Sequence, residues 1–381
     1  MAELHISDIF RGHWERFAAS ERLPTVVHKA ARAIMACRTA ALGGHANLCD
    51  SGHLTIGYNS CRSRSCPRCA TKRVCSWLAR QARTLLGCGH HHVILTVPHE
   101  VNPLWMVNRT AIGNLVFSAS RDSLLVLLAD RRYLGAVPGI LMALHTWGQQ
   151  LSQHLHTHCV VTAGGVGPDG RWRRPRRRRL LATEPLRRLF RGKFIAGLRK
   201  LARQGRLRLP TGWTAADVEA VCRTLASKRW NVQVRERYVD PTAVLNYLGR
   251  YVNGGPFGER RLISYDGHTV TFRYRGRRGE DKHQVMSLEA REFIARYIRH
   301  VPPEGFHMVR GFGLYRRGAG SDAIRAAAEQ AVPITTEVRA SLTARAELPN
   351  ALLCPECGSR FRLTTIIRPT HAPPAERRLV A

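Results

Sequence analysis

The chain has 381 residues, with 60 Lys and Arg against 27 Asp and Glu, which gives a formal net charge of +33 and an isoelectric point near 11.2. This excess predicts a polyanionic partner such as nucleic acid, because neutralising phosphates releases their counterions. Its 44% hydrophobic content is enough for a sizeable core, divided over two or three units. The sequence has no secretory signal and no membrane-spanning run, so we do not expect a membrane protein. For the same reason we expect a protein of the reducing cytoplasm rather than one held together by disulfides.

The first two predicted units are a basic helical lead over residues 1–36 and a small module over residues 37–82 that is rich in cysteine. The module contains a CxxC knuckle, Cys66-Pro67-Arg68-Cys69, and a tetrahedral zinc site needs four such ligands. We expect structural zinc on Cys49, His53, Cys66 and Cys69, with Cys61 or His45 as the substitute ligand. The remaining cysteines of the first 250 residues are expected to be small buried residues: Cys37, Cys75, Cys88, Cys159 and Cys222.

Residues 88–313 are predicted to form one α+β domain. Its strands are expected at 92–97, 140–146, 156–162, 262–265 and 269–274, and the Asp266-Gly267 pair predicts a hairpin turn between the last two. Helices are expected at 184–204, at 214–228 behind a Thr214 to Asp217 capping pattern, and at 288–299 behind Ser287. Helices packed on an antiparallel sheet are the expected architecture.

Three histidines alternate along one predicted strand of this domain: His154, His156 and His158. Alternate side chains of a strand share a face, so two or three of these imidazoles can bind one metal ion. The alternative is that they are core histidines, but burying three imidazoles costs free energy unless each finds a partner.

A second pattern places Tyr247 and Tyr251 four residues apart on a predicted helix, which Asp240 can cap and Gly254-Gly255-Pro256 ends. These tyrosines could simply belong to a buried helical stripe. Beside a metal that polarises a phosphate, however, a tyrosine can attack that phosphate, and Mg²⁺ or Mn²⁺ suits this chemistry. Arg250 is a candidate to hold a phosphate oxygen.

The densest basic run lies between the strands and the first long helix. We expect it to follow a DNA backbone beside the metal site, with its tryptophan stacking on a base; the alternative is a solvated loop. The run consists of Arg171, Trp172, Arg173, Arg174, Arg176, Arg177, Arg178 and Arg179.

The last predicted unit, residues 314–381, contains an Ala-rich helix, a second knuckle formed by Cys354 and Cys357, and a Pro-containing tail. Two cysteines supply only half of the four ligands of a tetrahedral zinc site, and such a pair binds zinc weakly. The knuckle can complete a site with His371, pair with another surface, or bind no metal.

Several stretches in a fixed order resemble the rolling-circle HUH transposases, the two-tyrosine group of the insertion sequence ninety-one type, including their zinc-binding N-terminal domain. The matching stretches are Cys61 to Cys69, His92 to Glu100, Leu144 to Gln149, His154 to His158, Tyr247 to Tyr251, Arg260 to Tyr265 and Glu292 to Phe306.

The resemblance implies an HUH-endonuclease-like fold and cleavage of single-stranded DNA through a 5′ phosphotyrosine. It assigns His156 and His158 to the metal, His154 as a possible third ligand or an orienting neighbour, and Tyr247 and Tyr251 as nucleophiles. Thr157 departs from the family, which normally has a bulky apolar residue between the two histidines. No third ligand is identified, and Asn246 and Asn253 are guesses for it.

The expected partner is therefore DNA, mainly single-stranded element ends near the nucleoid, bound by a chain that can form homo-oligomers. Two alternatives stay open. The same fold could serve a replication initiator or relaxase, which nicks and rejoins DNA without moving an element. A non-catalytic zinc protein could also bind nucleic acid through its charge alone.

Overall fold

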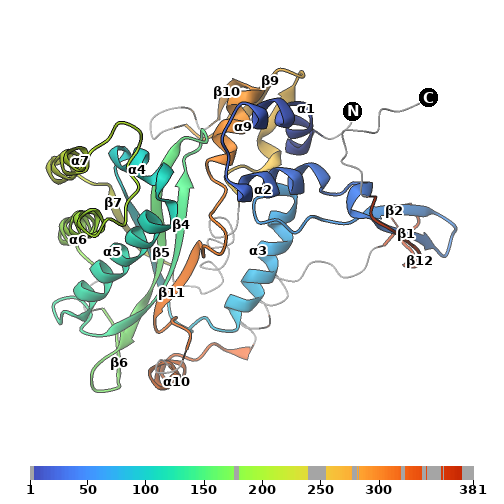
Figure 1. Cartoon of the computed structure of the whole chain (residues 1–381). Helices are drawn as coiled ribbons and strands as arrows, with labels where there is room; N and C mark the ends of the chain where they lie inside the picture. Colours follow the sequence, from blue (N-terminus) through green and yellow to red (C-terminus); the bar gives the residue numbers. More distant parts are fainter. Residues whose placement is uncertain are drawn as a thin grey trace.

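The computed structural model shows several layers of helices and antiparallel sheets (Figure 1). It describes residues 4–175, 180–238, 255–276, 281, 283–318, 322–336, 340, 353–354 and 356–370.

The central sheet has the strand order β11-β4-β5-β3-β7, all antiparallel. These strands are β3 (His90–Thr96), β4 (Val137–Trp147), β5 (Gln153–Val166), β7 (Val232–Tyr238) and β11 (Val309–Gly313). The short strand β6 (Trp172–Arg173) pairs with the far end of β5. β4 and β5 are buried almost throughout, because helices cover both faces of the sheet.

One face of the sheet carries the largest core. Four helices pack here: α4 (Asn102–Val107), α5 (Arg109–Ala129), α6 (Thr183–Arg203) and α7 (Ala215–Ser227). α5 is long and apolar enough in composition to cross a membrane, but it lies against β4, β5 and α6 with much of its length buried. A core helix of a soluble domain has the same composition.

The opposite face of the sheet is covered by α3 (Pro67–Ala82), the helix that follows the first knuckle. Trp77 and Leu78 of α3 pack against Leu141 and Val160. Farther along the same side, α10 (Asp322–Ala331) contacts the ends of β5 and β6. The cysteine-rich module is therefore built onto the central sheet through α3.

A second core joins the two N-terminal helices to a distant part of the chain. α1 (Ile6–Ala19) and α2 (Thr25–Ala36) share this core with α9 (Ala290–Ile298) and the three-stranded sheet β10-β9-β8. The strands are β8 (Leu262–Tyr265), β9 (Thr269–Tyr274) and β10 (Gln284–Glu289). The expected helical lead is thus folded onto residues 257–301.

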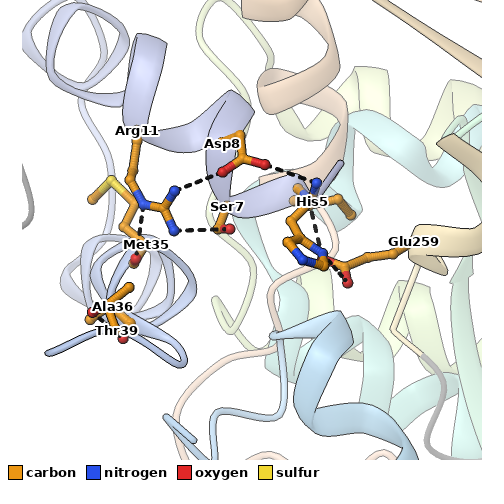
Figure 2. Close-up of polar contacts among 9 residues, drawn as sticks. His5, Ser7, Asp8, Arg11, Met35, Ala36, Thr39 and Glu259 are labelled. Carbon is orange, nitrogen blue, oxygen red and sulfur yellow. Dashed lines mark hydrogen bonds and ion pairs between the residues drawn. The ribbon is translucent and has the colours of Figure 1, made fainter. Parts of the chain in front are cut away.

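Polar contacts at the start of α1 fix this arrangement (Figure 2). Glu259 accepts a hydrogen bond from the backbone N–H of Ile6 and lies 3.1 Å from the His5 ring. Arg11 pairs with Asp8 at 2.7 Å and donates to the backbone carbonyl of Met35, which ties α1 to α2.

The third sheet combines residues from both ends of the described chain. Its strand order is β12-β1-β2, with β1 (Gly44–Cys49), β2 (Leu54–Tyr58) and β12 (Phe361–Ile367). In Figure 1 it lies on the side of the molecule opposite α6 and α7. The residues expected to form a separate C-terminal tail therefore complete the N-terminal module.

The α+β class and the antiparallel sheet expected from the sequence are confirmed. The β8–β9 hairpin turns at Gly267 with a φ of 97°, and Asp266 accepts two backbone N–H groups, as its Asp-Gly pair predicts. Thr214 and Asp217 form the predicted capping box of α7. The cap expected at Ser287 is wrong, because Ser287 lies inside β10 and pairs with Thr271.

Tyr297 connects the cysteine module to the second core, and its loss should destabilise both. Its hydroxyl is fully buried and donates to the Ser65 carbonyl at 2.6 Å. We expect Tyr297→Phe to lower the free energy of unfolding by about 1–2 kcal/mol, because a buried carbonyl loses its partner. Urea unfolding measures this, with Tyr58→Phe on exposed β2 as the control; equal stability of both variants would contradict the assignment.

Candidate functional site

Three histidines converge on the face of the central sheet that α3 covers. His156 and His158 alternate along β5, and the antiparallel register places His145 of β4 directly opposite His156. One ring nitrogen from each of the three lies within 4.8 Å of the others. This arrangement leaves open coordination positions for a substrate, as a catalytic metal site requires.

The hydrogen bonds around these rings suit metal binding. Nδ1 of His156 donates to the backbone carbonyl of His154 at 2.8 Å, so its Nε2 is left as an acceptor. Nδ1 of His158 lies 3.0 Å from Nε2 of His92, and the Nε2 atoms of His156 and His158 lie 3.1 Å apart. When Nδ1 of His158 donates to Nε2 of His92, the Nε2 lone pairs of His156 and His158 face each other. A cation bound between these two nitrogens would remove their repulsion.

Burial keeps these rings neutral, which is the form that binds a metal. Burial, followed by the neighbouring His145 charge, holds the pKa of both His156 and His158 well below the ordinary value. Burial, followed by the charge of Arg235, lowers the pKa of His92 to about 3. Arg235 on β7 is therefore a cation close to this site.

An aromatic side chain and a cavity adjoin the histidines. The Trp147 ring stacks on His145, with centroids 4.7 Å apart and planes 14° apart. Trp147 also lines a cavity of about 270 Å³ between α3 and the sheet, together with Trp77, Arg73 and Gly255. An open aromatic face next to a metal site can stack on a nucleic acid base.

The structure brings together His156 and His158 of the predicted strand, but the sequence did not predict their third partner. His154 is outside the cluster, and its backbone carbonyl orients His156. His145, His92 and Arg235 were not assigned. The signal for His145 was available: a hairpin turning between positions 150 and 151 pairs residue 145 with residue 156.

The surroundings of Thr157 explain why this chain can have a polar residue where the resemblance leads one to expect a bulky apolar one. Its side chain points away from the histidines into the opposite core and is fully buried. Its hydroxyl lies 3.3 Å from that of Ser120 on α5. The polar group is thereby satisfied, so the substitution leaves the histidine face unchanged.

The remaining candidates for nucleophile and third ligand lie outside the described residues. These are Tyr247, Tyr251, Arg250, Asn246 and Asn253. The described chain stops at Tyr238, the end of β7, and resumes at Gly255 beside the cavity.

The described start of the arginine run, residues 171–174, is far from the histidines, contrary to the prediction. Trp172 pairs with Val166, eight residues beyond His158 on β5, which corresponds to about 26 Å along a strand. Trp172 is half-buried against the core near Leu86 and Ala328, so it is not a free stacking platform. Arg173 donates to Gly135 and pairs with Asp169.

The other arginines of the run differ in position. Arg171 and Arg174 are exposed, while Arg176, Arg177, Arg178 and Arg179 lie outside the described residues.

Four cysteines form the first of two further clusters. Cys37, Cys61, Cys66 and Cys69 place their sulfurs within 4.8 Å of one another, with Cys69 at 3.6 Å from Cys37 and 3.5 Å from Cys61. Two sulfurs bound to one tetrahedral zinc lie about 3.8 Å apart. The spacing is therefore close to that of a four-thiolate zinc site.

Arg73 of α3 supports the assignment of this cluster. Its Nε and Nη1 atoms are buried and have no hydrogen-bond partner in the described part of the chain. Burial lowers the pKa of Arg73, and the charges of Cys69, Cys66 and Cys61 oppose that shift. A zinc ion with four thiolates carries two negative charges, which offset a buried guanidinium.

The second cluster combines Cys49 and His53 with Cys354 and Cys357. The single set expected from the sequence, Cys49, His53, Cys66 and Cys69, is therefore wrong in its grouping. Cys37 is a candidate ligand rather than an ordinary buried residue. His45 belongs to neither cluster, and His371 lies outside the described residues. Sequence spacing could not separate the sets, because one pair comes from residues more than about 300 positions away.

Two family models match the chain. Residues 139–322 match the family described as "Putative transposase", and residues 9–97 match the "Transposase zinc-binding domain". The chain is 38% identical over 315 residues to "Putative transposase y4qJ" of Sinorhizobium fredii, covering 81% of this chain and 79% of that protein. It is 29% identical over 290 residues to the "Transposase for insertion sequence element IS801" of Pseudomonas savastanoi pv. phaseolicola, covering 74% and 68%. No solved structure matches it.

The three-histidine cluster predicts a divalent metal site that depends on His145. We expect His145→Ala and His156→Ala each to weaken Mn²⁺ binding by more than about 10-fold, because each removes one ligand. Titration calorimetry on the purified chain measures this. The matched control is His283→Ala, which replaces an exposed histidine outside the cluster; retained affinity in the His145 variant would rule out this ligand.

The lowered pKa values of His156 and His158 predict a weak dependence of metal binding on pH. Two imidazoles with an ordinary pKa of 6.5 would lose about 14-fold in neutral ligand between pH 7.5 and 6.0. Since burial lowers both pKa values, both rings stay neutral through this range, and the loss of Mn²⁺ affinity should be no more than about 4-fold, which is what a third imidazole with an ordinary pKa would add. The same calorimetric titration at the two pH values tests this; a 14-fold loss would mean that the rings titrate as solvent-exposed groups.

Proposed function

The chain belongs to the transposases of the insertion sequence ninety-one type, and on this basis we propose that it cleaves and rejoins single-stranded DNA through a 5′ phosphotyrosine intermediate. The proposal extends to its biological role, which is to move an insertion sequence by a rolling-circle type of mechanism. Element ends at the nucleoid are its substrates, and action as a homo-oligomer stays a prediction.

The observation that carries the proposal is the convergence of His145, His156 and His158 on one face of the sheet. The imidazoles of His156 and His158, which burial keeps neutral and hydrogen bonds orient, would bind a divalent cation together with His145 and leave room for phosphate oxygens. A bound Mg²⁺ or Mn²⁺ would polarise the phosphate and stabilise the charge that develops on it.

Tyr247 and Tyr251 are the proposed nucleophiles. The position of Gly255, the first described residue after them, is consistent with this role. Gly255 lines the same cavity as Trp147, whose ring stacks on the metal ligand His145. Tyr251 is four residues before Gly255, so covalent geometry limits their separation to about 14 Å. This limit allows a tyrosine of this segment to reach the cavity beside the histidines.

In the proposed reaction, the tyrosine oxygen forms a bond to phosphorus while the bond from phosphorus to the 3′ oxygen breaks. The tyrosine proton is lost, and the departing 3′ oxygen takes up a proton to become a hydroxyl. A tyrosine with a pKa near 10 is mostly protonated at neutral pH, so stabilisation of the phosphate must drive the attack. Attack by a 3′ hydroxyl on the phosphotyrosine reverses the step and rejoins DNA without ATP.

Two residues near the histidines are assigned to substrate binding. Arg235 is exposed and supplies a cation beside the histidines for a phosphate oxygen, and its guanidinium donates to the half-buried Gln233 side chain at 3.2 and 3.4 Å. Trp147 supplies a ring face for a base next to the scissile phosphate. The exposed Arg171 and Arg174 are assigned to a more distant part of the DNA.

The decisive test is an adduct assay with labelled single-stranded oligonucleotides that carry element-end sequences. With Mg²⁺ or Mn²⁺ we expect a denaturation-resistant adduct in which the protein is joined to the new 5′ phosphate end of the cleaved DNA. Chelator, His156→Ala and the double variant Tyr247→Phe/Tyr251→Phe should each reduce it more than about 100-fold. Tyr133→Phe, at a half-buried tyrosine packed against the α5 core, is the matched control.

The two single tyrosine variants show which residue acts first. An adduct that survives in the double variant or forms with chelator would contradict the mechanism. DNA binding without any adduct would favour the non-catalytic alternative. An adduct whose strands are rejoined but never transferred to a new target would favour the initiator or relaxase alternative.

A further inference from the structure

The second cluster joins two parts of the chain that are distant in sequence. Sγ of Cys49 lies 3.3 Å from Nδ1 of His53 and 3.6 Å from Sγ of Cys357. Sγ of Cys354 lies 3.5 Å from the same Nδ1. Ligands of a tetrahedral zinc are about 3.8 Å apart for two sulfurs and about 3.6 Å apart for sulfur and nitrogen. All three distances are therefore close to those of a zinc site.

The surroundings of the cluster also orient two parts of it for metal binding, the His53 ring and the Cys354–Cys357 turn. Nε2 of His53 lies 3.3 Å from the Glu356 carboxylate, so this nitrogen carries the proton and Nδ1 turns its lone pair toward the sulfurs. After Cys357 the chain turns at Gly358 with a φ of 72°, and its N–H donates to the Cys354 carbonyl at 2.8 Å. This turn is what brings two cysteines of a knuckle to one ion.

The sheet that carries this cluster lacks a hydrophobic core of its own. Among the described residues, none of the four apolar clusters includes a residue of β1, β2 or β12. Leu54, Ile56, Leu363 and Ile366 are more than half exposed. Among its described residues, Cys49 is the one buried apolar side chain of this small three-stranded sheet, so the sheet needs another source of stability, and a structural metal is the usual one.

We propose that Cys49, His53, Cys354 and Cys357 form a second, separate zinc site, which fastens β12 to β1 and closes the cysteine module with residues from the C-terminal region. Its ligand is one divalent zinc ion held by three thiolates and one imidazole. The site is independent of the four-cysteine cluster, which lies wholly within residues 37–69. The inference also stands apart from the proposed DNA chemistry, because its tests do not use DNA.

Zinc content measured by mass spectrometry on the full chain, purified under reducing conditions, tests the site. We expect His53→Ala and Cys354→Ser/Cys357→Ser each to lose one zinc per chain relative to the unsubstituted chain. His53→Cys should keep that zinc, since a fourth thiolate is an equally good ligand. Cys75→Ser, at a half-buried cysteine of α3 outside both clusters, should also keep it.

Hydrogen exchange locates the structural effect. In His53→Ala we expect amides of residues 361–367 to exchange at least about 10-fold faster, with the exchange of β4 and β5 unchanged. Unchanged zinc content in His53→Ala, or protected β12 amides after its zinc is lost, would overturn the proposal. Loss of both zinc ions from this single variant would also overturn it, because the two sites would then be coupled.

Discussion

The antiparallel pairing of β4 with β5 is the constraint on which the candidate site depends. The register sets His145 against His156 and Ala143 against His158, so a ligand from one strand meets two from the next. A shift of one residue would turn all of these side chains to the opposite face. The hydrophobic core prevents such a shift, because residues 140, 142, 144, 155, 159 and 161 of the same two strands are packed beneath α5 and α6.

This pairing also explains how much of the site could be predicted from the sequence. The alternation of His156 and His158 depends only on the geometry of one strand, and a local pattern is enough to find it. The roles of His145 and His92 depend on which strands are neighbours, and that is decided by long-range packing. Arg235 could not be found for the same reason, since β7 pairs with β3 across more than about 130 residues of chain.

The cysteines show the same limit in a stronger form. The CxxC spacing predicted Cys66 and Cys69 as zinc ligands and marked Cys354 and Cys357 as a possible half-site, because a tight turn brings such pairs together locally. Which pairs share an ion is decided by the fold: Cys37 follows α2 and reaches Cys69, while β12 carries the second knuckle to Cys49. The start of α7 and the β8–β9 hairpin could be predicted from the sequence, because the residues that cap a helix or form a turn act over only three or four positions.

The contribution of β12 to the N-terminal sheet has a consequence for synthesis of the protein. β1 and β2 leave the ribosome early, but the strand that pairs with β1 follows roughly 300 residues later. At usual elongation rates of about 5–20 residues per second, β1 waits on the order of 15–60 s for its partner. During that time it presents an unpaired strand edge, which can recruit other chains. Co-translational folding of this protein must therefore begin elsewhere, and the N-terminal module is among the last parts to be completed.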